Sequence, residues 1–204
     1  MTVEASTRVT RSAGSQKPPV KHQNEQYDDE VIEVVKQVKK PKNALAETTT
    51  ATMTPSTKLS VGDSLPDIAL LNHDGDSVRL HDLVKEKGAV LFFYPKANTP
   101  GCTTQACQYR DEYQEFVAKD FQVVGCSADS PKSQKSWRDK HGFPYPLLSD
   151  PEFQLISPLG AKKSPKGVIR GHVVVTKGGK IADIHIPIAP KASSTVAMAE
   201  ICKL

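Results

Sequence analysis

Long hydrophobic runs, early cysteines and a strong charge of one sign are all lacking in this 204-residue sequence. The longest apolar stretch, residues 89–94, is far too short to cross a bilayer, and no amino-terminal segment has the apolar core of a secretory signal. The net charge of +4 falls well short of the single-sign field of a dedicated nucleic-acid binder. We therefore expect a soluble protein of a reducing compartment, with no membrane partner and no direct nucleic-acid site.

Aromatic residues are nearly absent from residues 1–57, where Tyr27 stands alone, and Phe, Trp and Cys are missing altogether. A segment with so little apolar surface cannot offset the entropy lost on ordering, so a disordered extension is expected. Within it, residues 39–42 form a basic run, Lys-Lys-Pro-Lys, that suits the acidic groove of a nuclear import receptor or is only a solvated charge run. The tail predicts a location in the nucleus, with the cytoplasm as a second location.

The remainder, residues 58–204, shows short apolar runs that alternate with helical segments, as expected of an α/β sheet. Residues 89–94 have no polar alternation and predict a central strand buried on both faces. Further strands are expected at residues 67–71, 77–80, 121–126, 145–148, 170–176 and 180–186, and helices at residues 102–118, 131–140 and 191–203. The prediction is one domain with a central mixed sheet flanked by helices.

Residues 94–107 combine a strand end, a loop and a helix start, which is where open α/β sheets place their ligand sites. Cys102 falls in the first helical turn, where free backbone N–H groups and the positive end of the helix dipole stabilise thiolate over thiol. Thr99 can offer its hydroxyl to a reacting oxygen or to the sulfur, while Pro95 and Pro100 stiffen the loop and limit water access. Cys102 is therefore the candidate nucleophile.

A second cysteine, Cys107, lies five residues beyond Cys102. On a regular helix this spacing separates the two Cα atoms by about 8.6 Å. A disulfide needs Cα atoms within about 7 Å, so a bond between these residues requires the first turns of the helix to unwind. A buried or metal-binding pair is the alternative, but no second Cys-x-x-Cys motif or close pair of histidines supplies further ligands. We expect no metal and no cofactor.

The pattern Pro95-x-x-x-Thr99-x-x-Cys102 resembles the active-site motif of peroxiredoxins, and the short spacing to Cys107 resembles the PrxQ, or bacterioferritin-comigratory-protein, subfamily. Arg170, which precedes a strand and a Gly-Lys turn, matches the position of the active-site arginine of this family. The likeness extends from about residue 59 to the end. Within it, residues 127–130, 147–151 and 159–163 look most like fungal nuclear thiol peroxidases.

This resemblance implies a thioredoxin-like fold of the peroxiredoxin type and a thiol peroxidase that reduces hydrogen peroxide and organic hydroperoxides. Cys102 would attack the peroxide and become a sulfenic acid, which would condense with Cys107 to a disulfide that thioredoxin reduces. Thr99 and Arg170 would stabilise the charge on the departing oxygen. The family pattern implies no cofactor, and we expect a monomer. One departure from it is Gln105, at a position where many bacterial relatives have Glu.

Two other functions fit parts of the sequence. A non-enzymatic chromatin-associated protein could use a degenerate peroxidase fold to anchor the basic tail, but intact Thr99, Cys102, Cys107 and Arg170 argue against it. A thioredoxin-like disulfide reductase is disfavoured because four residues, and not two, separate the cysteines. Peroxide-dependent consumption of thioredoxin, compared with reduction of insulin disulfides, distinguishes the three functions.

The other reactive or aromatic residues are expected to have structural roles. Cys126 lies in the middle of an apolar strand and is expected in the core. Cys202, in the last helical turn, is expected to be non-catalytic even if exposed. Arg110 is assigned to a structural contact with Asp111 or Glu112 in preference to a place beside the thiolate, and Trp137 and Phe143 are expected to pack in the core.

Overall fold

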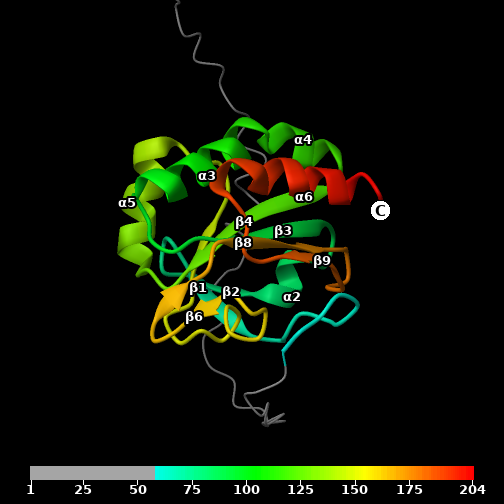
Figure 1. Ribbon diagram of the computed structural model, residues 1–204, viewed down its shortest axis with the longest axis horizontal. Coiled ribbons are helices and arrows are strands. Elements are labelled where there is room, and N and C mark those ends of the chain that lie inside the picture. The colour runs from blue at the N-terminus through cyan, green and yellow to red at the C-terminus, as the bar shows by residue number, and fades with distance from the viewer. Residues whose placement is uncertain (1–57) are drawn as a thin grey trace, which may run out of the picture. The chain divides into compact units, whose positions relative to one another are not determined.

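A computed structural model describes residues 58–204, which form a seven-stranded mixed sheet covered by helices (Figure 1). The strand order is β2-β1-β5-β4-β3-β8-β9, in which β3 and β5 run parallel to β4 and the other pairs are antiparallel. The strands are β1 (Ala69–Asn72), β2 (Ser77–Arg79), β3 (Gly88–Phe93), β4 (Phe121–Ser127), β5 (Leu147–Ser149), β8 (Gly171–Val175) and β9 (Ile181–His185). The α/β class and the mixed sheet predicted from the sequence are confirmed.

Helices cover both faces of this sheet. Figure 1 shows α3, α4 and α6 together on one side and α2 on the other. The helices are α2 (Leu80–Leu83), α3 (Pro100–Asp111), α4 (Tyr113–Ala118), α5 (Pro131–His141) and α6 (Ser193–Ile201), the last preceded by a short 3₁₀ turn, η1 (Pro190–Ala192). Within residues 58–204, no helix combines the length and the apolar character needed to cross a bilayer.

Strand β3 separates two hydrophobic cores. All six of its residues are buried, because β4 and β8 flank it and helices cover both of its faces. Its alternate side chains enter different cores: Leu91 and Phe93 pack with the residues beneath α2, whereas Val90 and Phe92 pack with α3 to α6. The second core carries most of the aromatic rings, among them the predicted packing residues Trp137 and Phe143. The central strand predicted from the apolar run is therefore confirmed.

Two parts of the prediction were wrong in detail. The single helix expected at residues 102–118 begins earlier, at Pro100, and is broken at Glu112 into α3 and α4. Proline favours the first helical position because its missing N–H is not needed there, which explains the earlier start. The sequence pattern also missed α2 and a small separate hairpin of β6 (Lys162–Lys163) and β7 (Gly167–Val168). The predicted disordered tail and its basic run lie outside the described residues.

Candidate active site

Helix α3 begins at the loop that follows β3, and Cys102 is its third residue. Thr99 has an extended backbone at the N-cap and accepts the N–H of Thr103 through its carbonyl oxygen at 2.8 Å. Cys102 is buried in this first turn, where backbone N–H groups lack helical partners. The predicted position of the candidate nucleophile in the first turn is confirmed.

The Arg170 guanidinium contacts the sulfur of this cysteine. Its Nη2 donates to Cys102 Sγ at 3.3 Å, and its Nη1 donates to the side-chain oxygen of Gln105 at 2.7 Å. Arg170 immediately precedes β8, and the register of β8 on β3 pairs Gly171 with Phe93, which sets Arg170 beside the carboxyl end of β3. The structure thus brings together two predicted site residues from distant parts of the chain.

Gln105 is the residue of this site whose role the sequence reasoning missed. It is completely buried, its Oε1 accepts from Arg170, and its Nε2 donates to the hydroxyl of Ser193 in α6 at 3.0 Å. The available signal was its position three residues after Cys102, because residues three apart share one face of a helix. Gln105 therefore orients Arg170 toward the sulfur.

The loop before α3 is held from the end of β4. Asp129 accepts the backbone N–H of Ala97 at 2.7 Å and the hydroxyl of Ser127 at 3.0 Å. Asn98 has a left-handed backbone, with φ of 57°, and its side-chain oxygen accepts from Lys140 at 3.2 Å. These contacts fix the path of the chain from β3 into the helix that carries Cys102.

Cys107 lies farther along α3, half-buried, and both it and Cys102 are free thiols here. The helix between them is held from outside by Tyr145, whose hydroxyl donates to the carbonyl of Ala106 at 2.6 Å. The indole of Trp137 likewise donates to the hydroxyl of Thr103 at 3.2 Å. A surface pocket of about 470 Å³ opens beside Cys107, lined by Asn98, Pro100, Thr103, Thr104, Cys107, Lys140 and His141.

The remaining predicted site residues lie in the loop, and within residues 58–204 neither Thr99 nor Pro95 makes a hydrogen bond to the sulfur. The Thr99 hydroxyl donates its proton to the carbonyl of Lys96 at 2.9 Å, so the hydroxyl oxygen can act toward a ligand only as a hydrogen-bond acceptor. Pro95 follows β3 and is exposed, and its predicted shielding of the site stays a prediction.

The other cysteines and Arg110 lie as the sequence suggested. Cys126 is buried in β4, and desolvation raises the pKa of its thiol well above the usual value. Cys202 is exposed at the end of α6. Arg110 bonds the carbonyl of His141 at 2.9 Å and the carboxylate of Asp111 at 2.9 Å, which gives it a structural role.

Comparison with known proteins assigns the family. Residues 61–184 match the AhpC/TSA family. The chain is 48% identical over 145 residues to peroxiredoxin bcp1 of Schizosaccharomyces pombe, a match that covers 70% of this chain and 74% of that protein. It is 35% identical to peroxiredoxin Bcp of Bacillus subtilis, a match that covers 60% of this chain and 82% of that protein. The crystal structure of peroxidoxin BcpB from Mycobacterium tuberculosis superposes with a TM-score of 0.68 at 32% identity, over 73% of this chain and 99% of that one. The chain therefore belongs to the AhpC/TSA family and is a peroxiredoxin of the PrxQ/Bcp type, a peroxidase that uses thiols to reduce peroxides.

Proposed function

We propose that Cys102 is the sulfur that reduces the peroxide. The 3.3 Å contact between Arg170 and Cys102 Sγ at the start of α3 carries this proposal. The thiolate of Cys102 attacks one peroxide oxygen, the O–O bond breaks, and the other oxygen leaves as hydroxide or alkoxide and takes up a proton. Cys102 is thereby oxidised by two electrons to a sulfenic acid, and the products are water or an alcohol.

Arg170 and Thr99 bind the peroxide through different hydrogen bonds, Arg170 as a donor and Thr99 as an acceptor. The guanidinium beside the sulfur donates to the oxygen on which negative charge develops. Because the Thr99 proton is bonded to Lys96, the hydroxyl oxygen accepts the O–H of the entering hydroperoxide. The two contacts together align the O–O bond with the attacking sulfur.

Cys107 resolves the sulfenic acid in this scheme. Its thiolate attacks the Cys102 sulfur, the S–O bond breaks as the disulfide forms, and the departing hydroxide takes up a proton to give water. Both residues belong to one regular helix, in which their Cα atoms stand about 8.6 Å apart, beyond disulfide reach of about 7 Å. The reaction therefore requires α3 to unwind at its start. Both cysteines lie on one chain, so a monomer completes the cycle.

A thioredoxin-like dithiol completes the cycle by attack on the disulfide. The pocket beside Cys107 supports this assignment, since it leaves one side of the segment open to an attacking thiolate. Organic hydroperoxides join hydrogen peroxide as proposed substrates. A study of the bacterioferritin comigratory protein of Xanthomonas campestris, a structural neighbour, describes alkyl peroxide reduction by that protein.

The same proposal assigns a location to the protein. The basic run at residues 39–42 would be recognised by a nuclear import receptor and would direct the enzyme to the nucleus, with a remaining share in the cytoplasm. In this scheme the tail determines where the enzyme is located and takes no part in peroxide reduction.

Peroxide consumption coupled to thioredoxin tests the proposed roles. Cys102→Ser abolishes the reaction, because a serine hydroxyl is not ionised near neutral pH and lacks the nucleophilicity of sulfur. Cys107→Ser allows one turnover and then stops. The matched control is Cys202→Ser, at an exposed cysteine outside the site, which retains full activity. Turnover by the Cys102→Ser variant would contradict the assignment.

A further inference from the structure

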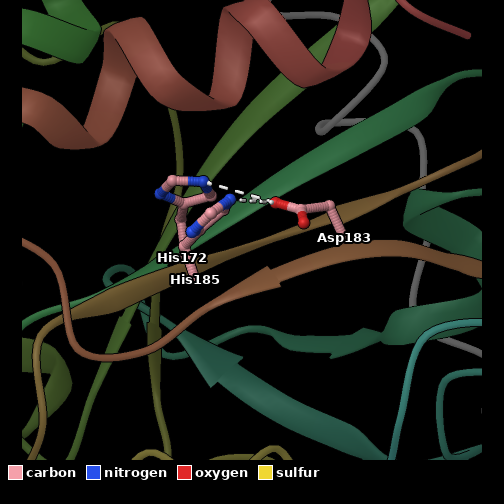
Figure 2. A group of neighbouring side chains, drawn as sticks. All are labelled: His172, Asp183 and His185. Atoms are coloured by element: carbon pink, nitrogen blue, oxygen red, sulfur yellow. Dashed lines mark ion pairs between the residues drawn. The ribbon is translucent and has the colours of Figure 1, made fainter.

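Three metal-ligating side chains gather on the β8–β9 hairpin, outside the site described above. The strand register places His172 of β8 directly opposite His185 of β9, so both side chains project from the same face of the sheet. Asp183 precedes His185 by two residues and shares that face. Figure 2 shows the two imidazole rings and the carboxylate converging beneath a helix, which is α6.

The facing atoms of this group are close together but are not satisfied by hydrogen bonds. His185 Nε2 lies 3.3 Å and His172 Nε2 lies 3.8 Å from Asp183 Oδ2, and one ligand atom from each residue lies within 4.8 Å of the others. His172 is completely buried, yet its Nε2 has no hydrogen-bond partner, and neither has Asp183 Oδ2. Burying a polar atom without a partner is unfavourable, because the atom loses its hydrogen bonds to water and gains none in return. A buried nitrogen thus points at a buried oxygen, and a cation between them would satisfy both.

We propose that His172, Asp183 and His185 form a binding site for a divalent transition-metal ion of the zinc class. Two imidazoles and one carboxylate are a ligand set that zinc accepts at about 2.0–2.2 Å, with water in the fourth position. Ligand atoms 3.3 Å apart, each about 2.05 Å from an ion, subtend about 107° at that ion, which is close to the tetrahedral angle. The 3.8 Å pair subtends about 136°, and the three ligand atoms lie within 4.8 Å of one another, so the side chains must draw slightly closer together when an ion binds.

Ser193 of α6 supports the buried ligand from behind. Its hydroxyl lies 3.2 Å from His172 Nδ1, so the imidazole can donate its Nδ1 proton to this oxygen and leave Nε2 free for a metal. Histidine ligands commonly donate their second ring nitrogen to such an acceptor, which fixes the ring. The same hydroxyl accepts from Gln105, which in turn holds Arg170. An ion at this site would brace the β8–β9 hairpin against α6 and against the network behind Cys102.

The site is open on one side. The side chain of His185 is 41% exposed and that of Asp183 is 19% exposed, whereas His172 is closed off from solvent. An ion can therefore enter past His185 and exchange all but one of its waters for the three side-chain ligands. Glu200 of α6 interacts electrostatically with both histidines and adds negative charge beside the group, and Lys203 pairs with Glu200 at 2.6 Å.

Cobalt and zinc titrations of the full chain test this proposal. Thiols also bind these ions, so the parent protein carries Cys102→Ser, Cys107→Ser and Cys202→Ser. We expect one Co²⁺ per chain, seen by its visible absorption and displaced by Zn²⁺. His185→Ala and Asp183→Asn, made separately at partly exposed positions, weaken the affinity at least about tenfold. His81→Ala, at an exposed histidine of α2, is the matched control and leaves the affinity unchanged.

Thermal unfolding supplies a second readout. Zn²⁺ raises the melting temperature of the parent and of the His81→Ala protein, because an ion that binds only the folded state stabilises it. The rise disappears in His185→Ala and Asp183→Asn, whose metal-free melting temperatures report that both proteins are folded. Absence of stoichiometric binding to the parent would overturn the proposal. Binding that survives both substitutions would also overturn it, because the ion would then be held elsewhere.

Discussion

Tyr145 holds the part of α3 that lies between the two cysteines, and this contact can measure the proposed unwinding. Its buried hydroxyl donates to the Ala106 carbonyl at 2.6 Å. Burial raises the pKa of Tyr145 well above its usual value, so the hydroxyl keeps its proton at neutral pH. If formation of the Cys102–Cys107 disulfide unwinds this segment, the hydrogen bond exists only in the dithiol form.

Tyr145→Phe should therefore stabilise the disulfide relative to the dithiol. A hydrogen bond of this kind contributes about 0.5–1.5 kcal/mol net. For a two-electron couple about 1.4 kcal/mol corresponds to about 30 mV, so the reduction potential should fall by about 10–30 mV. The sign is negative because the substitution removes an interaction from the reduced state and none from the oxidised state.

Equilibration against thioredoxin or dithiothreitol redox buffers gives this potential, with the disulfide fraction read by mass after thiol alkylation. Tyr113→Phe is the matched control, because the Tyr113 hydroxyl makes no side-chain hydrogen bond within residues 58–204. Amide exchange checks the same event: protection across residues 102–110 should fall on oxidation and persist in β3. Equal potentials for Tyr145→Phe, Tyr113→Phe and the unmodified chain would refute the unwinding.

Three further predictions concern other parts of the molecule. Arg170→Lys should lower the rate of peroxide reduction about 10²-fold, measured by stopped flow. The planar guanidinium donates to the Cys102 sulfur and to Gln105 Oε1 from two nitrogens, and the single nitrogen of an ammonium cannot reproduce this geometry. Burial lowers the pKa of His73 below 6.5, so the folded state favours the neutral ring and stability is lost as pH falls below 6.5. Urea unfolding at a series of pH values should show this decrease in the free energy of unfolding. The decrease should be smaller in His73→Gln, which has no ring to protonate. A reporter fused to residues 1–57 should concentrate in the nucleus, and replacing the three lysines of residues 39–42 by Ala should weaken that effect.

Local patterns were sufficient to predict much of this fold. The apolar run of β3, the turn that joins β8 to β9, and Pro131 at the start of α5 each act on neighbours within a few residues. The break at Glu112 was not predicted, because the sequence on either side continues a helical spacing without Gly or Pro. Propensity alone gives no reason to end a helix there.

The candidate site was predictable only where the residues are close in sequence. Cys102 and Thr99 belong to one loop and helix start, so their placement follows from helix geometry. The contacts of Gln105 with Arg170 and Ser193 join residues far apart in the chain and depend on how α6 packs over β8. His172 and His185 likewise stand 13 residues apart and meet only through the strand register, so a search for closely spaced histidines missed them.

The central claim is that Cys102 is oxidised by peroxide and that Cys107 closes the disulfide. Peptide mapping by mass spectrometry after one equivalent of hydrogen peroxide tests it most directly. The account predicts a Cys102–Cys107 disulfide in the unmodified chain and a sulfenic acid on Cys102 in Cys107→Ser. A bond from Cys102 to Cys126 or Cys202, or a Cys102 that stays reduced while peroxide is consumed, would contradict it.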